Sequence, residues 1–193
     1  GNTPPAVTSI TMLPEGPLTT SSDLSVVWEQ TDIDGDQESG SQIRWWVDGE
    51  WVKDYDDMTT IPSSLTIRDQ HWSVQVLPGD GESLGSSMKT TSRSIDNAAP
   101  SPPEVSLENT PVGNMMEQPD SLSDMIAVAI SNDPDGEPVT YTYTWFRNGF
   151  HVPDLDGQSV VDQSRIEPGS TWGVEVTASD PWGTQSSSFT EVV

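Results

Sequence analysis

The feature of this sequence that most constrains its fold is an internal repeat. When Trp72 is placed on Trp172, an offset of 100 residues, WSVQVLPGDGESLGSS aligns with WGVEVTASDPWGTQSS. The same offset places Trp45 on Trp145. Self-similarity at a fixed period indicates one structural unit built more than once. A chain of 193 residues has room for two such units.

The stretch SIDNAAPSPP separates the two copies. Its three prolines, Pro100, Pro102 and Pro103, favour a short, stiff and extended linker. We therefore expect one domain at residues 1–97 and a second at residues 98–193.

Alternation of apolar and polar residues predicts short β-strands throughout. In residues 42–48, Ile43, Trp45 and Val47 fall on one face. Turn signals such as Asp-Gly follow at regular spacing, and no long helical periodicity appears. The pattern predicts an all-β, sandwich-like fold of about seven strands per repeat. The expected strands include residues 51–55, 64–68, 86–95 and 160–166, and the tryptophans expected in the cores are Trp45, Trp72, Trp145 and Trp172.

Charge excludes several classes of partner. The chain has 7 Lys plus Arg against 31 Asp plus Glu, a net charge of -24. Nucleic acids and anionic membrane surfaces require basic neutralisation, so we expect neither as a partner. The composition favours solubility in a saline medium and binding of divalent cations. There is no cysteine, and no apolar run approaches the roughly 18 residues of a membrane span, so we expect no membrane insertion by this stretch.

The repeated pattern resembles a known group of proteins. It comprises an acidic-Gly-acidic loop, an aromatic strand ending W-x-x-N-G, then W-x-V-x-V-x-x-x-D and I-x-N-x-x-P. This pattern is similar to the tandem immunoglobulin-like repeats, PKD-like and cadherin-like, of prokaryotic extracellular surface proteins. The resemblance covers both repeats and implies two immunoglobulin-like β-sandwich domains. It also implies an extracellular or cell-surface location and neighbouring modules of a longer chain as partners.

Acidic loops suggest a calcium site. In an immunoglobulin-type sandwich, the start of the domain, the B–C loop and the F–G loop share one end. Calcium takes six to eight oxygen ligands, several of them carboxylates. The glycine of these loops is at the fourth position, which differs from an EF-hand. The candidate ligands are Asp96, Asn97, Asp133, Asp135, Glu137 and Asp180 for the second repeat, and Asp32, Asp34, Asp36 and Asp80 for the first.

The acidic loops have a second interpretation. Asp, Asn and Gly are good turn formers, and an acidic protein contains many such loops without bound metal. Both interpretations remain open from the sequence.

A possible ligand platform is specific to the first repeat. Trp46 points away from the core residue Trp45, and Trp51 and Tyr55 follow the next turn. Together these rings could stack on a sugar. The alternative is that they cover a sheet face or contact a neighbouring module.

Catalysis is not expected. His71 and His151 are not equivalent in the repeats, and no G-x-S-x-G, H-E-x-x-H or phosphate-loop motif is present. The Asp54/Asp56 and Asp154/Asp156 pairs have the composition of a glycosidase dyad, but they recur in turns of both repeats.

The function expected from the sequence is therefore a non-catalytic structural or adhesive spacer, with a joint that calcium could stiffen. The alternative is a carbohydrate-binding accessory module that uses the Trp46, Trp51 and Tyr55 face. Surface glycans or proteins are the corresponding partners, and binding of a partner strand at an exposed sheet edge is a third option.

Overall fold

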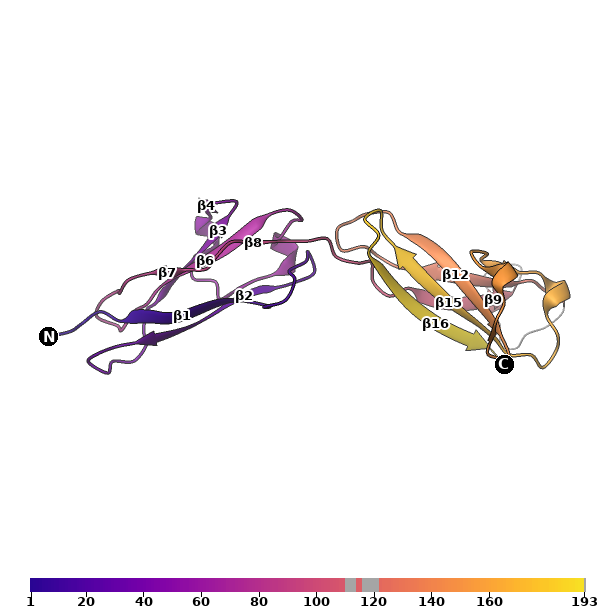
Figure 1. The fold of residues 1–193 in the computed structure, drawn as a ribbon, viewed down its shortest axis with the longest axis horizontal. Helices are drawn as coiled ribbons and strands as arrows, with labels where there is room; N and C mark the ends of the chain where they lie inside the picture. The colour runs from indigo at the N-terminus through magenta and orange to yellow at the C-terminus, as the bar shows by residue number, and fades with distance from the viewer. Residues whose placement is uncertain (110–113, 116–121, 193) are drawn as a thin grey trace. The chain divides into compact units, whose positions relative to one another are not determined.

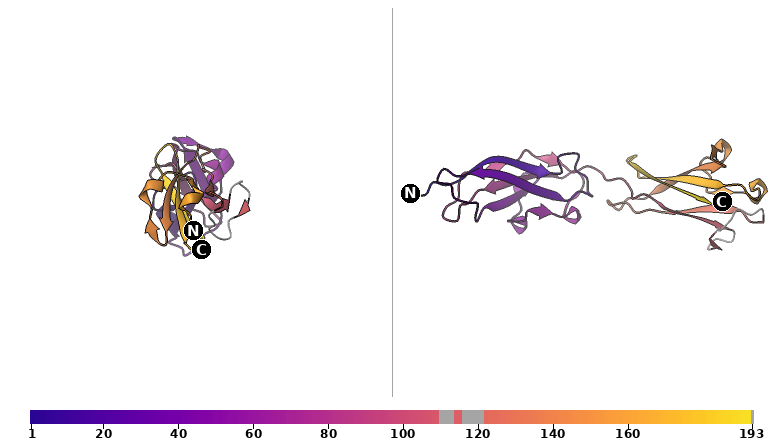
Figure 2. Two further views of the ribbon diagram at one scale, coloured as in Figure 1. Left: turned by 90° about the vertical axis from the view of Figure 1, so that its right-hand side faces the viewer. Right: turned by 90° about the horizontal axis from the view of Figure 1, so that it is seen from below.

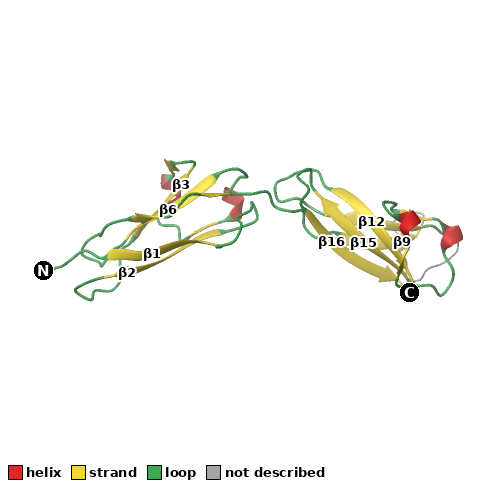
Figure 3. Ribbon diagram, in the orientation of Figure 1, coloured by secondary structure: helices red, strands yellow, loops and turns green. Residues whose placement is uncertain are grey.

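The computed structural model describes residues 1–109, 114–115 and 122–192 (Figure 1). The chain divides into two compact units, unit 1 (Gly1–Asn97) and unit 2 (Ala98–Val193). Both are built from β-strands joined by turns and short 3-10 segments (Figure 3). Among the described residues, no helix has the length and apolar character needed to cross a membrane.

Unit 1 contains two antiparallel sheets, and their strands can be followed in two further views (Figure 2). The three-stranded sheet has the order β1-β2-β5, and the larger sheet has the order β4-β3-β6-β7 with β8 also paired to β6. The strands of the first sheet are β1 (Ala6–Leu13), β2 (Leu24–Thr31) and β5 (Thr60–Ile61). Those of the second are β3 (Gln42–Val47), β4 (Glu50–Trp51), β6 (His71–Leu77), β7 (Met88–Lys89) and β8 (Arg93–Ser94).

The described residues of unit 2 repeat this plan with two four-stranded sheets, of order β10-β9-β11-β14 and β13-β12-β15-β16. The first sheet contains β9 (Glu104–Asn109), β10 (Asn114–Met115), β11 (Met125–Ile130) and β14 (Val160–Val161). The second contains β12 (Thr140–Arg147), β13 (Phe150–His151), β15 (Trp172–Ser179) and β16 (Gln185–Val192). The all-β expectation and the two immunoglobulin-like sandwiches are therefore confirmed.

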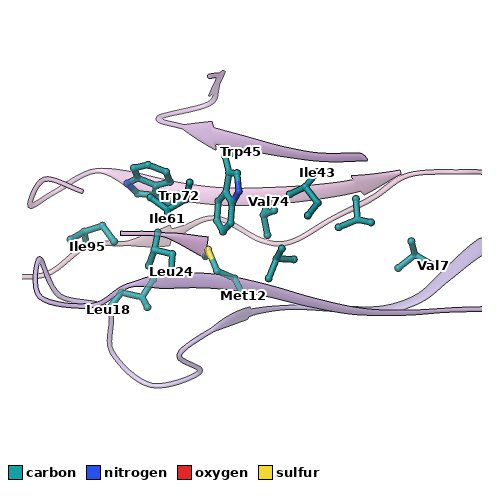
Figure 4. Close-up of a cluster of buried hydrophobic side chains, with 12 residues drawn as sticks. Val7, Met12, Leu18, Leu24, Ile43, Trp45, Ile61, Trp72, Val74 and Ile95 are labelled. Atoms are coloured by element: carbon teal, nitrogen blue, oxygen red, sulfur yellow. The ribbon is translucent and has the colours of Figure 1, made fainter. Parts of the chain in front are cut away.

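The repeated tryptophans form the centre of each core. In unit 1, Trp45 and Trp72 are fully buried and meet edge to face, with ring centroids 6.2 Å apart (Figure 4). The Trp45 indole N–H donates to the Met58 carbonyl at 2.8 Å, so the ring is buried without losing its hydrogen bond. In unit 2, Trp145 and Trp172 are buried in the same way, with centroids 6.3 Å apart. The predicted core role of all four is confirmed.

Several predicted strands are shorter than expected. Residues 51–55 contain only β4 and then the 3-10 segment η1 (Lys53–Tyr55), and residues 64–68 contain the end of η2 (Ser63–Leu65). Residues 160–166 pass from β14 into η4 (Gln163–Arg165), and residues 86–95 break into β7 and β8. In unit 2, η3 (Pro153–Leu155) follows β13. The 3-10 segments turn because amides bond to carbonyls three residues back, as the Asp56 amide does to the Lys53 carbonyl.

The first strand of unit 1 and the loop that follows it are joined to the last part of that unit by isolated parallel bridges. Ala6 bridges Ser86, and Thr19 bridges Asp96. At the first bridge, Gly85 lies so close to Pro5 that an added Cβ would sit 1.6 Å from the Pro5 carbonyl oxygen. Only a glycine allows this approach.

Candidate functional site

The acidic loop of unit 1 folds around one carboxylate. The Asp32 Oδ1 atom accepts hydrogen bonds from the amides of Asp34, at 2.7 Å, and Asp36, at 3.4 Å. Gly35 between them has a φ of 83°, a left-handed conformation that favours glycine. The spacing of three aspartates around a glycine thus specifies a tight turn whose amides bind one oxygen of Asp32.

Unit 2 builds the same turn from different residues. The Asp133 Oδ1 atom accepts from the amides of Asp135, at 2.8 Å, and Glu137, at 3.4 Å. Gly136 again has a positive φ, of 76°. The two loops share this geometry although Glu137 replaces the aspartate of the first loop.

The second oxygen of the central aspartate is the unusual atom of each loop. Among the described residues, Asp32 Oδ2 and Asp133 Oδ2 are buried and have no hydrogen-bond partner. Buried carboxylate oxygens are normally satisfied, because leaving one unpaired is costly. Each lies in a group of carboxylates that offer one oxygen apiece within 4.8 Å of one another. The groups are Asp32, Asp34 and Asp36 in unit 1, and Asp133, Glu137 and Asp180 in unit 2.

Asp180 reaches the unit 2 group from the turn after β15. It is 6% exposed, and its Oδ1 atom accepts from the amides of Trp182 and Thr184. Trp182 also donates its indole N–H to Glu137 Oε1 at 2.7 Å, which ties the two loops together. Two acidic loops far apart in sequence therefore meet at one end of unit 2.

Asp80 holds the corresponding turn of unit 1 and also binds the start of the chain. Hydrogen bonds from the Ser83 amide, the Asn2 side chain and the Glu82 amide hold the pKa of its carboxyl well below the ordinary value. These bonds favour the ionised carboxylate. Asp34 also binds the start of the chain, since its Oδ2 atom accepts from the Thr3 amide at 2.6 Å.

Asp80→Asn is expected to destabilise unit 1 at neutral pH and to matter less in acid. Because the folded pKa is depressed, the stabilisation is present above the unfolded pKa of about 3.9 and is lost as pH falls through the folded pKa. Urea unfolding of both proteins at neutral pH and near pH 2 measures this difference. The exposed Glu50→Gln is the matched control. An equal difference at both pH values would contradict the assignment.

The start of unit 2 is bound by its own acidic loop. The Ala98 amide donates to Asp135 Oδ2 at 3.0 Å, and the Thr184 hydroxyl donates to the Ala98 carbonyl at 3.4 Å. Asp135 therefore contacts the first residue of the unit.

The predicted ligands Asp96 and Asn97 belong to unit 1. The Asp96 amide donates a hydrogen bond to the Leu18 carbonyl, and Asn97 Oδ1 accepts one from the Arg68 guanidinium.

The predicted aromatic platform is divided between surface and core. Trp46 and Trp51 face each other across β3 and β4, and Trp51 is 37% exposed. Tyr55 instead stacks on the buried Trp72 at 5.8 Å and packs against the core. Asp56 Oδ1 accepts from the Trp51 indole N–H at 2.8 Å.

Three cations surround these indoles, and sequence reasoning missed them. The Arg44 guanidinium lies 4.9 Å and the Lys53 ammonium 5.1 Å from the centre of the Trp51 ring. The Lys89 ammonium lies 3.5 Å from the centre of the Trp46 ring. The signal available in the sequence was the alternation that places Arg44 beside Trp46 on the outer face of its strand.

The repeated carboxylate pairs have structural partners. In unit 2, Asp154 pairs with Arg165, and Asp156 lies 2.8 Å from the His151 ring. The hydrogen bond from Arg165 lowers the pKa of Asp154. A glycosidase acid needs a raised pKa, so this carboxyl is poorly suited to protonate a leaving group.

No protein-family model and no curated protein matches the chain. Among solved structures, a two-domain fibronectin type-III segment from chicken tenascin matches with a TM-score of 0.39 and 10% identity, covering 96% of this chain and 98% of that one. Fibronectin(III)-like modules of Clostridium thermocellum CbhA match with a TM-score of 0.34 and 10% identity, covering 95% and 93%. The assignment of two immunoglobulin-like units rests on the sheets and cores described above.

Proposed function

We propose that the chain is a non-catalytic spacer of an extracellular or cell-surface protein, and that calcium fixes the loop end at which each unit begins. The observation that carries the proposal is the repeated buried Oδ2 atom of Asp32 and Asp133, which has no partner among the described residues. The aspartate that carries each of these atoms belongs to a group of three carboxylates. A cation would neutralise the group and satisfy the unpaired oxygen.

The turn explains the position of only one of the two carboxylate oxygens of Asp32 and of Asp133. The Oδ1 atom of Asp133 binds the loop amides, as an isolated acidic turn would require. The burial of Oδ2 beside other carboxylates is an added cost that the turn does not need. Calcium is favoured over zinc because the group consists of carboxylates, and hard cations prefer oxygen ligands.

The contacts of Asp135 and Thr184 with Ala98 give the ion a mechanical role. A cation held by Asp133, Glu137 and Asp180 would order both loops that bind Ala98 and so fix the path of the chain into unit 2. In unit 1, Asp34 and Asp80 hold Thr3 and Asn2 in the same manner. The high negative charge would keep such modules apart and soluble in saline surroundings.

Calcium added to the chelated chain is expected to raise its melting temperature. At a concentration 100 times the dissociation constant, binding to the folded state alone stabilises by about 2.7 kcal/mol. Asp133→Asn is the sharpest variant, because the asparagine oxygen can still accept from the loop amides while the ligand atom Oδ2 is lost. Calorimetry should then show no calcium response of unit 2, with the response of unit 1 unchanged.

Two further measurements separate a lost ligand from a broken loop. Without calcium, Asp133→Asn should be as stable as the parent or more stable, since it relieves repulsion among carboxylates. The exposed Glu175→Gln removes the same charge outside the loops and should leave the calcium response intact. A flat titration up to millimolar calcium would refute the calcium proposal.

A further inference from the structure

The outer face of the β4-β3-β6-β7 sheet of unit 1 carries an unusual concentration of positive charge. Arg44, Lys53 and Lys89 lie there over the indoles of Trp46 and Trp51. We call this surface the cationic indole face. It holds three of the 7 Lys plus Arg residues of a chain whose net charge is -24.

These three cations have no carboxylate partner in the part of the chain that the structure describes. The ion pairs of the other cations include Arg68 with Asp69, Arg147 with Glu167 and Arg165 with Asp154. In a chain with 31 acidic residues, unpaired cations gathered on one face are unexpected. The Lys89 side chain is exposed, but its ammonium packs on the Trp46 ring, and this partial desolvation lowers the pKa of Lys89. An anion bound at this face would compensate that loss.

The sheet arranges the cations in a row. Arg44 pairs with Gln75 across β3 and β6, and Gln75 pairs with Lys89 across β6 and β7. Neighbouring strands are about 4.8 Å apart, so the two cations project from strands separated by about 10 Å. An open hollow of about 440 Å³ adjoins Lys89 at the edge of this sheet, where Thr90, Thr91 and Arg93 meet Glu15 and the β1 residues Ile10, Thr11 and Met12. The row of Arg44 and Lys89 itself lies on an open sheet face and is not enclosed in a pocket.

The fold itself does not require these residues. At the equivalent positions of unit 2, the row Arg44, Gln75 and Lys89 becomes Thr144, Glu175 and Phe189, with the same pairing of strands. The offset of 100 residues also replaces Trp51 by His151 and Lys53 by Pro153. The same sandwich forms without the cations, so the cationic indole face is a property of unit 1 alone.

We propose that the cationic indole face binds an anionic polysaccharide, one whose sugars carry carboxylate groups. Its carboxylates would pair with Arg44 and Lys89, and the apolar face of a sugar ring would pack on the exposed part of Trp51. This binding goes beyond the proposed spacer and calcium function and does not depend on it.

Three observations favour a polysaccharide over other anions. The open row of cations suits an extended polymer more than a small molecule. The exposed part of the Trp51 indole offers a flat apolar surface on which a sugar ring can pack. An acidic peptide has no sugar ring to place there. A second copy of this chain would bring another net charge of -24 to the interface, whereas a single glycan chain brings its charges only along the row. Salt screens repulsion beyond about 8 Å, so the local cations decide the contact.

The test is titration of the full chain with linear oligogalacturonate in calcium-free buffer, followed by tryptophan fluorescence and calorimetry. We expect a saturable response that weakens as sodium chloride is added. Arg44→Gln with Lys89→Gln should weaken binding about three- to thirtyfold, since two exposed charge pairs are lost. Arg147→Gln with Arg165→Gln removes the same charge from unit 2 and should leave the affinity unchanged.

Several results would overturn the proposal. The absence of a response, or an equal response in the two double variants, would remove the face as a binding site. Equal binding of a neutral oligoglucan would remove the role of charge, and equal binding of polyglutamate would indicate an acidic protein as the partner. Self-association in sedimentation, lost only in the Arg44 and Lys89 variant, would indicate a second copy. Because the buffer holds no calcium, none of these results bears on the metal proposal.

Discussion

Trp145→Ala is expected to destabilise unit 2 by about 3–5 kcal/mol while leaving unit 1 unchanged. The ring is fully buried, meets Trp172 edge to face and donates to the Gln158 carbonyl at 2.7 Å. Alanine would leave a large cavity and an unpaired carbonyl. Since small domains are stable by only about 5–15 kcal/mol, the variant unit should unfold at a much lower urea concentration.

Urea unfolding followed by circular dichroism measures this effect, and the two units should give separate transitions once one is weakened. Phe150→Ala is the matched control, because Phe150 is 77% exposed and its removal should change stability by less than about 0.5 kcal/mol. Equal weakening of both transitions by Trp145→Ala would show that the units do not unfold independently.

Gly85→Ala is expected to be the most damaging small change in unit 1. The added Cβ would lie 1.6 Å from the carbonyl oxygen and 2.7 Å from the carbonyl carbon of Pro5. Gly85 cannot retreat freely, because its amide donates to the Pro78 carbonyl at 2.8 Å. The first strand must therefore move, and overpacking of this kind costs about 1–3 kcal/mol or more.

Thermal melting and amide NMR spectra report this displacement, with the largest shifts expected at Asn2, Thr3 and Ser86. Gly16→Ala serves as the control, because no atom lies within 4 Å of its added Cβ and its φ is not positive. Unchanged spectra and melting in Gly85→Ala would mean that the first strand is not fixed against Gly85.

Much of the fold could be predicted because the same strand pattern occurs in both repeats, so that each copy supports the prediction made from the other. The alternation around Trp45 and Trp145 specifies the buried face of each strand, and the structure buries both rings completely. The lengths of the short strands were less predictable. A strand was expected over residues 51–55, yet amide bonds to residues three positions back close Lys53 to Tyr55 into a 3-10 turn.

The candidate sites were only partly predictable. The acidic loops were visible because Asp32, Asp34 and Asp36 are close in sequence, as are Asp133 and Glu137. Asp180 could be placed beside the second loop only from the expected arrangement of loops at one end of the sandwich, and two groups of carboxylates do meet. The cationic indole face was not visible, because Arg44 and Lys89 are brought together only by the pairing of β3 with β6 and β6 with β7. Alternation indicates which face a side chain occupies, but not which distant strand lies beside it.

The parallel bridges of unit 1 determine how it would bear tension. Asp96 is bonded on both sides to the first part of the chain, through Leu18 at 2.7 Å and Thr20 at 3.2 Å, and Ser86 bridges Ala6 in the same direction. Pulling the two ends of the unit apart would slide these parallel segments past one another. The hydrogen bonds of each bridge would then be loaded together in shear instead of opening one after another. Resistance to stretching of unit 1 would therefore begin at Ala6 and Asp96, before its tryptophan core is exposed.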